Sequence, residues 1–294
     1  MAESVIRFAG SGLRVQPPLS LYIHLPWCVK KCPYCDFNSH AAQDIPETAY
    51  IDALLLDLER ALPDVWGRTI HTVFFGGGTP SLFSAQGIDR ILTAVRTLMP
   101  LLPNAEITLE ANPGTVEAAR FAGFREAGVT RVSLGIQSFN PRHLQALGRI
   151  HDGDDARRAA ELAAIHFDTF NLDLMFALPG QTLAEALADL DTALDFRPSH
   201  LSAYHLTLEP NTPFGHSAPP NLPDDDLAAD MQLAIEARLN EAGMEHYETS
   251  AYARPLHASR HNLNYWRFGG YPGSGAVAPS QRGFYHPLPR RKWP

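Results

Sequence analysis

The chain has 294 residues and a formal net charge of -8 at neutral pH, with 45% hydrophobic and 19% charged residues. This composition suits one large domain, or one with a small addition, and allows a sizeable core. The negative balance predicts no nucleic-acid partner, because surfaces that bind nucleic acid are normally basic. No apolar run reaches the roughly 18 residues of a membrane span, and residues 1–18 resemble no signal peptide, so we expect neither a membrane helix nor export.

Hydrophobic periodicity predicts strands and helices that alternate along the first two thirds of the chain. After a leader at 1–18, six strands are expected at Leu19–His24, Thr69–Phe75, Glu106–Ala111, Arg131–Ile136, Thr169–Met175 and His200–Leu206. The helices expected between them are Glu47–Leu62, Ser84–Leu98, Thr115–Ala127, Asp154–Ile165 and Leu183–Asp195. Such alternation is typical of βαβ units, whose strands lie parallel in one sheet.

The unusual residues associated with each strand lie at or just after its C-terminal end. They are the cysteines after the first strand, residues 76–79, Glu110, Gln137, Asp173 and Thr207. A site assembled from the C-terminal ends of all strands is typical of a barrel, whereas an open sheet favours a single switch point. Six units fall short of the eight in a closed barrel. The sequence therefore predicts an α/β fold with a partial (β/α)6 barrel at residues 19–208.

The pattern changes from Glu209 onward. Proline and polar residues continue to Asp226, a helix is expected at Leu227–Ala242, and Met244–Tyr252 is a candidate strand. Beyond Tyr265 the chain is rich in glycine, proline and arginine and shows no periodicity. We therefore expect residues 209–294 to form a smaller, α-rich C-terminal appendage packed on the barrel, with a poorly ordered end.

All three cysteines lie within eight residues, as Cys28, Cys32 and Cys35 in a C-x3-C-x2-C spacing. An odd number of clustered thiols is a poor basis for disulfides, and it indicates metal binding in a reducing, cytoplasmic compartment. Three thiolates on one loop suit an iron–sulfur cube, in which one iron would lack a protein thiolate and stay open to a ligand. From spacing alone, two alternatives remain: zinc completed by His24 or His40, or cysteines packed as small hydrophobic residues.

The segment Leu19–Phe37, LSLYIHLPWCVKKCPYCDF, resembles the signature of the radical S-adenosylmethionine (SAM) superfamily. Its flanks, YIHLPWC and CDF, are similar to those of the oxygen-independent coproporphyrinogen oxidases and their heme chaperone relatives. The resemblance implies the partial barrel and a [4Fe-4S] cluster whose open iron chelates the amino and carboxylate groups of SAM. It covers about residues 20–266, and its motifs are specific in combination rather than singly.

The loop Gly76-Gly77-Gly78-Thr79 follows a predicted strand. Glycines let backbone N–H groups approach a ligand closely and can cradle a carboxylate or phosphate, although a triple glycine alone indicates only a tight turn. In the family this loop contacts the amino group of SAM. The resemblance further implies SAM contacts at Tyr22, Gln137, Arg149 and Asp173, and a second cofactor site near Tyr34 and Thr207.

Three charged residues, Glu110, Arg149 and Asp173, can also be interpreted without the family resemblance. Glu110, at the end of the third strand, could be a helix-capping or solvated carboxylate, but an acidic side chain that faces the mouth of a barrel better suits a ribose diol or an ammonium group. Arg149 could pair with a carboxylate in a bidentate manner, or form an exposed ion pair at a helix end. Asp173 stands among apolar neighbours, so we expect it to be paired or bound to a ligand.

The segment His261–Trp266, HNLNYW, resembles the motif associated with heme binding in the chaperone branch. Histidine is a natural axial ligand of heme iron, so the resemblance implies that His261 binds heme. Without the family, a core histidine packed among aromatic residues is the better explanation of this segment. The oxidases have a further cysteine shortly after the position of Cys35, where this chain has Asp36 and Phe37, and they have a longer leader. Both differences favour the chaperone branch.

We therefore expect a heme chaperone that binds heme, a [4Fe-4S] cluster and SAM, and delivers heme to an acceptor protein. It would meet a membrane only through that acceptor, and it could form a homodimer. We expect no coproporphyrinogen oxidase activity. The alternative is a radical oxidase in which cleavage of SAM yields a 5′-deoxyadenosyl radical. The segment Gly269–Ser280, GGYPGSGAVAPS, departs from the family's GDYLGIGAGAHS, and a protein that has lost both functions is a third hypothesis.

Overall fold

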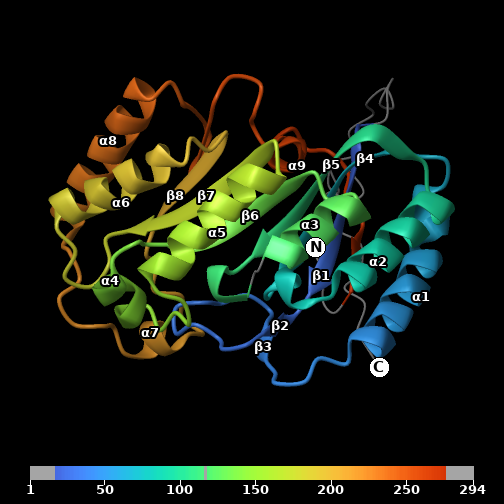
Figure 1. The fold of residues 1–294 in the computed structure, drawn as a ribbon, viewed down its shortest axis with the longest axis horizontal. Helices are drawn as coiled ribbons and strands as arrows, with labels where there is room; N and C mark the ends of the chain where they lie inside the picture. The colour runs from blue at the N-terminus through green and yellow to red at the C-terminus, as the bar shows by residue number, and fades with distance from the viewer. Residues whose placement is uncertain (1–16, 116–117, 276–294) are drawn as a thin grey trace, which may run out of the picture.

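The computed structural model describes residues 17–115 and 118–275. Within them, one nine-stranded sheet has the order β11-β1-β4-β5-β6-β7-β8-β10-β9 (Figure 1). Its parallel core consists of β1 (Leu19–Leu25), β4 (Ile70–Gly77), β5 (Leu101–Ala111), β6 (Arg131–Gln137), β7 (Thr169–Phe176) and β8 (His200–His205). These are the six predicted strands, so the predicted α/β class and partial (β/α)6 barrel are confirmed.

Five connecting helices cover one face of this sheet (Figure 1). They are α1 (Glu47–Val65), α2 (Ala85–Leu98), α3 (Ala118–Ala127), α5 (Gly153–His166) and α6 (Leu183–Asp195), with the short α4 (Pro141–Ala146) before α5. Capping boxes at Asp152 and Thr182 begin α5 and α6, since each side chain accepts the orphan N–H groups of the first turn. The helix expected from Thr115 begins only at Ala118, because the turn Pro113–Thr115 is a short 3-10 helix.

The side chains of each strand point alternately to the helix-covered face of the sheet and to the inside of the barrel. Leu21, Ile23 and Leu25 of β1 are fully buried in the hydrophobic core. Alternate residues point the other way because successive side chains of a strand face opposite sides. On this inner face the side chains are unusually polar; they include Ser20, Tyr22, His24, Thr72, Thr108, Glu110, Ser133, Asn171, Asp173, Ser202 and Tyr204. The inside of the barrel is therefore built for hydrogen bonding rather than for apolar packing.

The residues after 209 contribute to both edges of the sheet. Their elements are α7 (Pro213–His216), α8 (Asp225–Glu241), β9 (Glu245–Glu248), β10 (Ala251–Ala253), α9 (Arg260–Trp266) and β11 (Gly273–Ser274). Strand β10 pairs antiparallel with β8 and with β9, while β11 pairs parallel with β1 at the opposite edge. The candidate strand Met244–Tyr252 is thus two strands joined by a tight turn. The domain boundary at residue 209 stays a prediction.

Two expectations lie wholly or partly outside the described residues. The leader at 1–18 is described only from residue 17, and the divergent end is described only to Gly275. None of the helices in residues 17–115 and 118–275 combines the length and the hydropathy that a membrane span requires.

Candidate functional site

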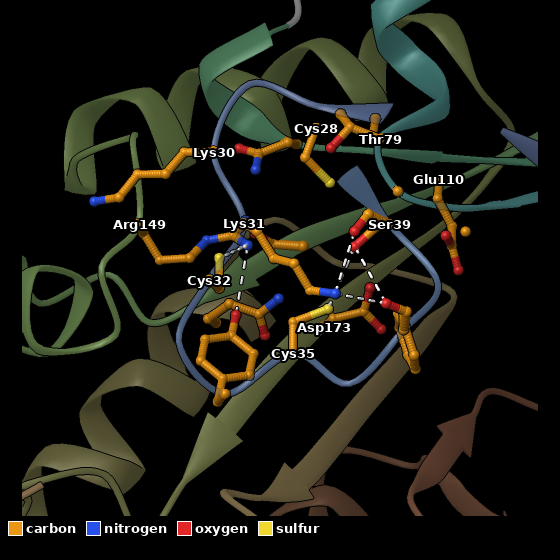
Figure 2. Close-up of a pocket in the computed structure, with 18 of the residues that line it drawn as sticks. Cys28, Lys30, Lys31, Cys32, Cys35, Ser39, Thr79, Glu110, Arg149 and Asp173 are labelled. Atoms are coloured by element: carbon orange, nitrogen blue, oxygen red, sulfur yellow. Dashed lines mark hydrogen bonds between the residues drawn. The ribbon is translucent and has the colours of Figure 1, made fainter. Parts of the chain in front are cut away.

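The cysteine loop is closed at its base by two short strands, β2 (Trp27–Cys28) and β3 (His40–Ala41), which pair in parallel. Across the loop, the Nζ atom of Lys31 donates hydrogen bonds to the carbonyl oxygens of Phe37 (2.9 Å) and Ser39 (3.2 Å). These bonds hold the loop in a defined shape. All three cysteines are free thiols, and they line one cavity of about 160 Å³ at the C-terminal ends of the strands (Figure 2).

Most of the predicted site residues meet at this cavity. Those that line it are Cys28, Cys32, Tyr34, Cys35, Gly77, Gly78, Thr79, Glu110, Gln137, Arg149 and Asp173. Tyr22 lies beside the cavity on the inner face of β1, where its hydroxyl contacts His24 Nδ1 at 3.2 Å. Thr207 does not line the cavity; it is exposed, and its Oγ1 donates to the carbonyl of His205. His261 lies elsewhere in the barrel.

The glycine loop owes its composition mainly to the neighbouring strand. The backbone N–H groups of Gly78 and Thr79 donate to the carbonyl oxygens of Leu25 (2.9 Å) and Trp27 (2.7 Å). A Cβ atom on Gly78 would lie 2.5 Å from the Trp27 carbonyl oxygen, which is far too close. These two amides therefore fasten β4 to the base of the cysteine loop and are not free for a ligand. The Gly77 amide donates to the carboxylate of Glu110 instead.

The Arg149 side chain lines the cavity and does not form an exposed ion pair. Its Nη2 donates to the carbonyl oxygen of Gly135 at 2.6 Å, and Nη1 contacts the Tyr34 hydroxyl (3.5 Å) and the Cys32 sulfur (3.6 Å). Burial lowers the pKa of Arg149, but Tyr34 and Cys32 outweigh this effect and the pKa is raised overall. Its buried Nε has no hydrogen-bond partner among the described residues. A buried donor without a partner is costly, so this part of the site is not fully satisfied by the protein alone.

Two carboxyl groups, those of Glu110 and Asp173, line the cavity. Burial, and next the nearby Asp173, raise the pKa of Glu110 to about 8. Burial also raises the pKa of Asp173, but hydrogen bonds from Ser202, Asn171 and Ser133 oppose the rise. The expectation that Asp173 is paired is met by these neutral donors. A cation placed between the two acids would relieve their repulsion.

The replacement Glu110→Gln is expected to remove a pH dependence of stability. Because the folded-state pKa of Glu110 is raised to about 8, the folded protein binds a proton that the unfolded chain has already lost. The stabilising effect is full below the ordinary glutamate pKa and disappears as the pH rises through about 8. The midpoint temperature of thermal unfolding, measured at about pH 5 and about pH 9, should therefore rise in the variant relative to the parent only at the higher pH. Glu126→Gln, at an exposed position of α3, is the control; equal gains in both variants would contradict the assignment.

Gln137 ends β6 in a strained conformation. Its φ of 67° lies in the left-handed region, which residues other than glycine rarely adopt. A register shift between Gly135 and Gln137 accompanies it, and Gln137 Oε1 accepts a hydrogen bond from the Tyr204 hydroxyl at 2.7 Å. Strain of this kind persists only where the surroundings over-determine it, and it is concentrated at functional sites. The conformation aims the Gln137 amide into the cavity.

Several cavity residues were missed by the sequence interpretation. Lys30, Lys31, Ser39, Asn112, Ser133, Gly135 and Tyr204 also line the cavity. For Ser133 and Tyr204 a signal existed, because polar residues recur at every second position of their strands. Lys30 and Lys31 are the two cationic side chains among them, and both are labelled in Figure 2.

His261 is buried, and both of its ring nitrogens are in hydrogen bonds. Its side chain is 1% exposed. Its Nδ1 is 2.7 Å from Thr72 Oγ1, its Nε2 is 2.5 Å from the Tyr265 hydroxyl, and its ring stacks on Phe74. Burial lowers its pKa to about 3, so the ring is neutral. A neutral imidazole can bind iron, but one of the two hydrogen bonds must first break.

The donors of the cavity suit a cluster with a polar cofactor better than a single zinc ion. Within the part of the chain that the structure describes, no three His, Cys, Asp or Glu side chains converge on one metal-ion position. Both ring nitrogens of His24 are in hydrogen bonds, to Tyr22 and to the carbonyl of Asn38. A cubane instead requires thiolates at separate corners. Arg149 and the two acids, which line the cavity, are suited to a ligand with carboxylate and cationic groups.

A partial barrel with three free thiols at its mouth fits a radical SAM protein, and residues 22–193 match the model of the Radical SAM superfamily. The heme chaperone HemW of Escherichia coli (strain K12) is 54% identical over 264 residues, which are 89% of this chain and 70% of that protein. HemW of Mycobacterium tuberculosis (strain ATCC 25618 / H37Rv) is 38% identical over 276 residues, with 91% and 71% covered. The chain therefore belongs to the radical SAM superfamily and, within it, to the family of the HemW heme chaperones.

Among solved structures, the coproporphyrinogen III oxidase HemN from Escherichia coli, a radical SAM enzyme, has a TM-score of 0.80 at 25% identity. The match covers 90% of this chain but only 65% of the oxidase, so the chain spans less than two thirds of that protein. The resemblance drawn from the cysteine segment is thus confirmed.

Proposed function

We propose that this protein is a heme chaperone, which binds heme, a [4Fe-4S] cluster and SAM, and which passes heme to an acceptor protein. The observation that carries the proposal is the 54% identity to the Escherichia coli heme chaperone over 89% of the chain. The cavity described above supports it, because its thiols, acids and arginine come together at one place.

In this proposal Cys28, Cys32 and Cys35 hold the cluster, and SAM lies along the ends of the strands. When bound, the cluster and SAM supply one-electron chemistry. The Arg149 guanidinium would pair with the cofactor carboxylate, while Glu110 and Asp173 would face its positive charges. The free thiols further support a cytoplasmic location, since clustered thiols persist in reducing compartments. We propose contact with a membrane only through the acceptor; sizing by gel filtration would show whether the protein forms a homodimer.

An oxidase is the second candidate, favoured by the TM-score of 0.80 to the coproporphyrinogen oxidase. One chain feature counts against it: Phe37 stands where the cysteine loop of the oxidases continues with a further cysteine. One anaerobic experiment with reconstituted protein separates the two. Heme titration should give a Soret band that saturates at about one heme per chain, without decarboxylation of added coproporphyrinogen. Turnover would favour the oxidase, and a titration without saturation would reject the chaperone.

We propose His261 as the heme ligand, with a rearrangement of α9 that releases it. If its Nε2 binds iron, Tyr265→Phe removes a competing hydrogen bond and should raise heme affinity by about three- to tenfold. His261→Ala should lower the affinity and shift the Soret band. Both effects are measured by heme titration monitored by absorbance, with cluster content as the control. Unchanged spectra and affinities in both variants would place the ligand elsewhere.

A further inference from the structure

A chain of hydrogen bonds crosses the inside of the barrel from β9 to the cavity. The Tyr247 hydroxyl lies 2.6 Å from His200 Nε2, and His200 Nδ1 lies 2.7 Å from Asn171 Oδ1. Asn171 Nδ2 then donates to Asp173 Oδ1 at 2.7 Å. Of these four residues only Asp173, labelled in Figure 2, lines the cavity. A residue on the far edge of the sheet is thus linked to a carboxylate of the candidate site.

The protons of this chain can be assigned from the Asp173 end. Asn171 turns its NH₂ group to Asp173 and Ser133 and its carbonyl oxygen to His200 and Ser202, and a carbonyl oxygen only accepts. His200 must then carry its proton on Nδ1. Burial, and next Arg131, lower the pKa of His200 well below its ordinary value, so Nε2 has no proton and accepts from the Tyr247 hydroxyl. The Tyr247 oxygen in turn accepts from the backbone N–H of Ser259 at 3.2 Å.

The side chains in this series of hydrogen bonds are held in fixed orientations. Asn171 is 3% exposed and His200 is 2% exposed, so water cannot easily replace a lost partner. Asn171 Nδ2 also donates to Ser133 Oγ (2.8 Å), and its Oδ1 also accepts from Ser202 (3.2 Å). Burial raises the pKa of Tyr247 to about 12, so its hydroxyl keeps its proton at neutral pH. Each buried donor and acceptor therefore depends on the orientation of the next.

We propose that Tyr247, His200 and Asn171 are positioning residues, which orient the Asp173 carboxylate toward SAM. The inference rests on the proposed function, because it takes SAM as the ligand of the cavity. Without the Tyr247 hydroxyl, the acceptor Nε2 of His200 and the backbone N–H of Ser259 lose their partner. The imidazole is then no longer held on that side and can shift from its position against the Asn171 carbonyl. Asn171 would follow, and its hydrogen bond to the Asp173 carboxylate would weaken.

The variant Tyr247→Phe tests the proposal, with Tyr252→Phe as a matched control. Tyr252 is a buried tyrosine on the adjacent β10, and its hydroxyl takes no part in the chain. In reconstituted protein we expect SAM affinity to fall about three- to tenfold in Tyr247→Phe and to stay unchanged in the control. Nitrogen-15 NMR of the imidazoles should show His200 protonated on Nδ1 in the parent, and a shifted Nε2 signal in Tyr247→Phe because Nε2 loses its hydrogen-bond donor. His200→Gln identifies the signal.

A double-mutant cycle separates positioning from general destabilisation. If Tyr247 acts through Asp173, the loss of affinity caused by Tyr247→Phe should disappear in an Asp173→Asn background. An equal loss in both backgrounds would overturn the inference, as would unchanged affinity in Tyr247→Phe. Either result leaves the proposed function intact provided that the parent binds SAM. A parent that binds no SAM would overturn both.

Discussion

Replacing Cys32 with alanine is expected to abolish the iron–sulfur absorption of the protein. The chain has only three cysteines, so no other thiolate can take the empty corner. Anaerobically reconstituted parent should hold about four irons per chain, and the variant should lose nearly all of them. Iron and sulfide analysis, together with the visible spectrum, measures the loss. The fold should persist, because Cys32 is only partly buried and lies outside the hydrophobic core.

Val29→Ala is the matched control for this variant. Val29 lies on the same loop and is exposed, so its truncation changes the loop without removing a thiol. It should keep the iron content of the parent. If Cys32→Ala retained full iron and sulfide, the cluster assignment would be wrong, and zinc or simple packing would return as the explanation of the cysteine spacing.

The replacement Gly78→Ala is expected to impair cluster assembly and SAM binding together. The added Cβ would lie 2.5 Å from the Trp27 carbonyl oxygen and 2.8 Å from the Pro26 carbonyl carbon. These are backbone atoms, which cannot rotate aside as a flexible side chain can. Overpacking of this kind costs about 1–3 kcal/mol, and here it would push β4 away from the base of the cysteine loop. Thermal unfolding and iron content per chain measure the two effects.

Gly114→Ala provides the comparison for this prediction. At Gly114 the nearest atom to an added Cβ is Cγ1 of the Ile150 side chain, at 3.3 Å, and a side chain can adjust. We therefore expect near-parent stability and iron content from Gly114→Ala. Equal behaviour of the two alanine variants would show that the contact between Gly78 and Trp27 is not what holds the cysteine loop in place.

The sequence by itself determined the architecture and most of the site. Alternating periodicities defined the six parallel strands, and strand polarity placed Glu110, Gln137 and Asp173 at one end of the barrel. Since the carboxyl ends of parallel strands meet at one edge, these residues had to lie near the cysteine loop. Such information is local: it depends on the spacing of residues along a single strand or loop.

Only the tertiary structure decided how individual side chains are used. Arg149 could have been an exposed ion pair, but the loop geometry turns it toward Cys32 and Gly135. His261 is held by Thr72, which is distant in the chain. Likewise, Tyr247 is linked to Asp173, through His200 and Asn171, only because β9 and β10 extend the sheet beyond β8. Hydrogen-bond partners far apart in the sequence depend on strand order and register, and no periodicity in the chain specifies these.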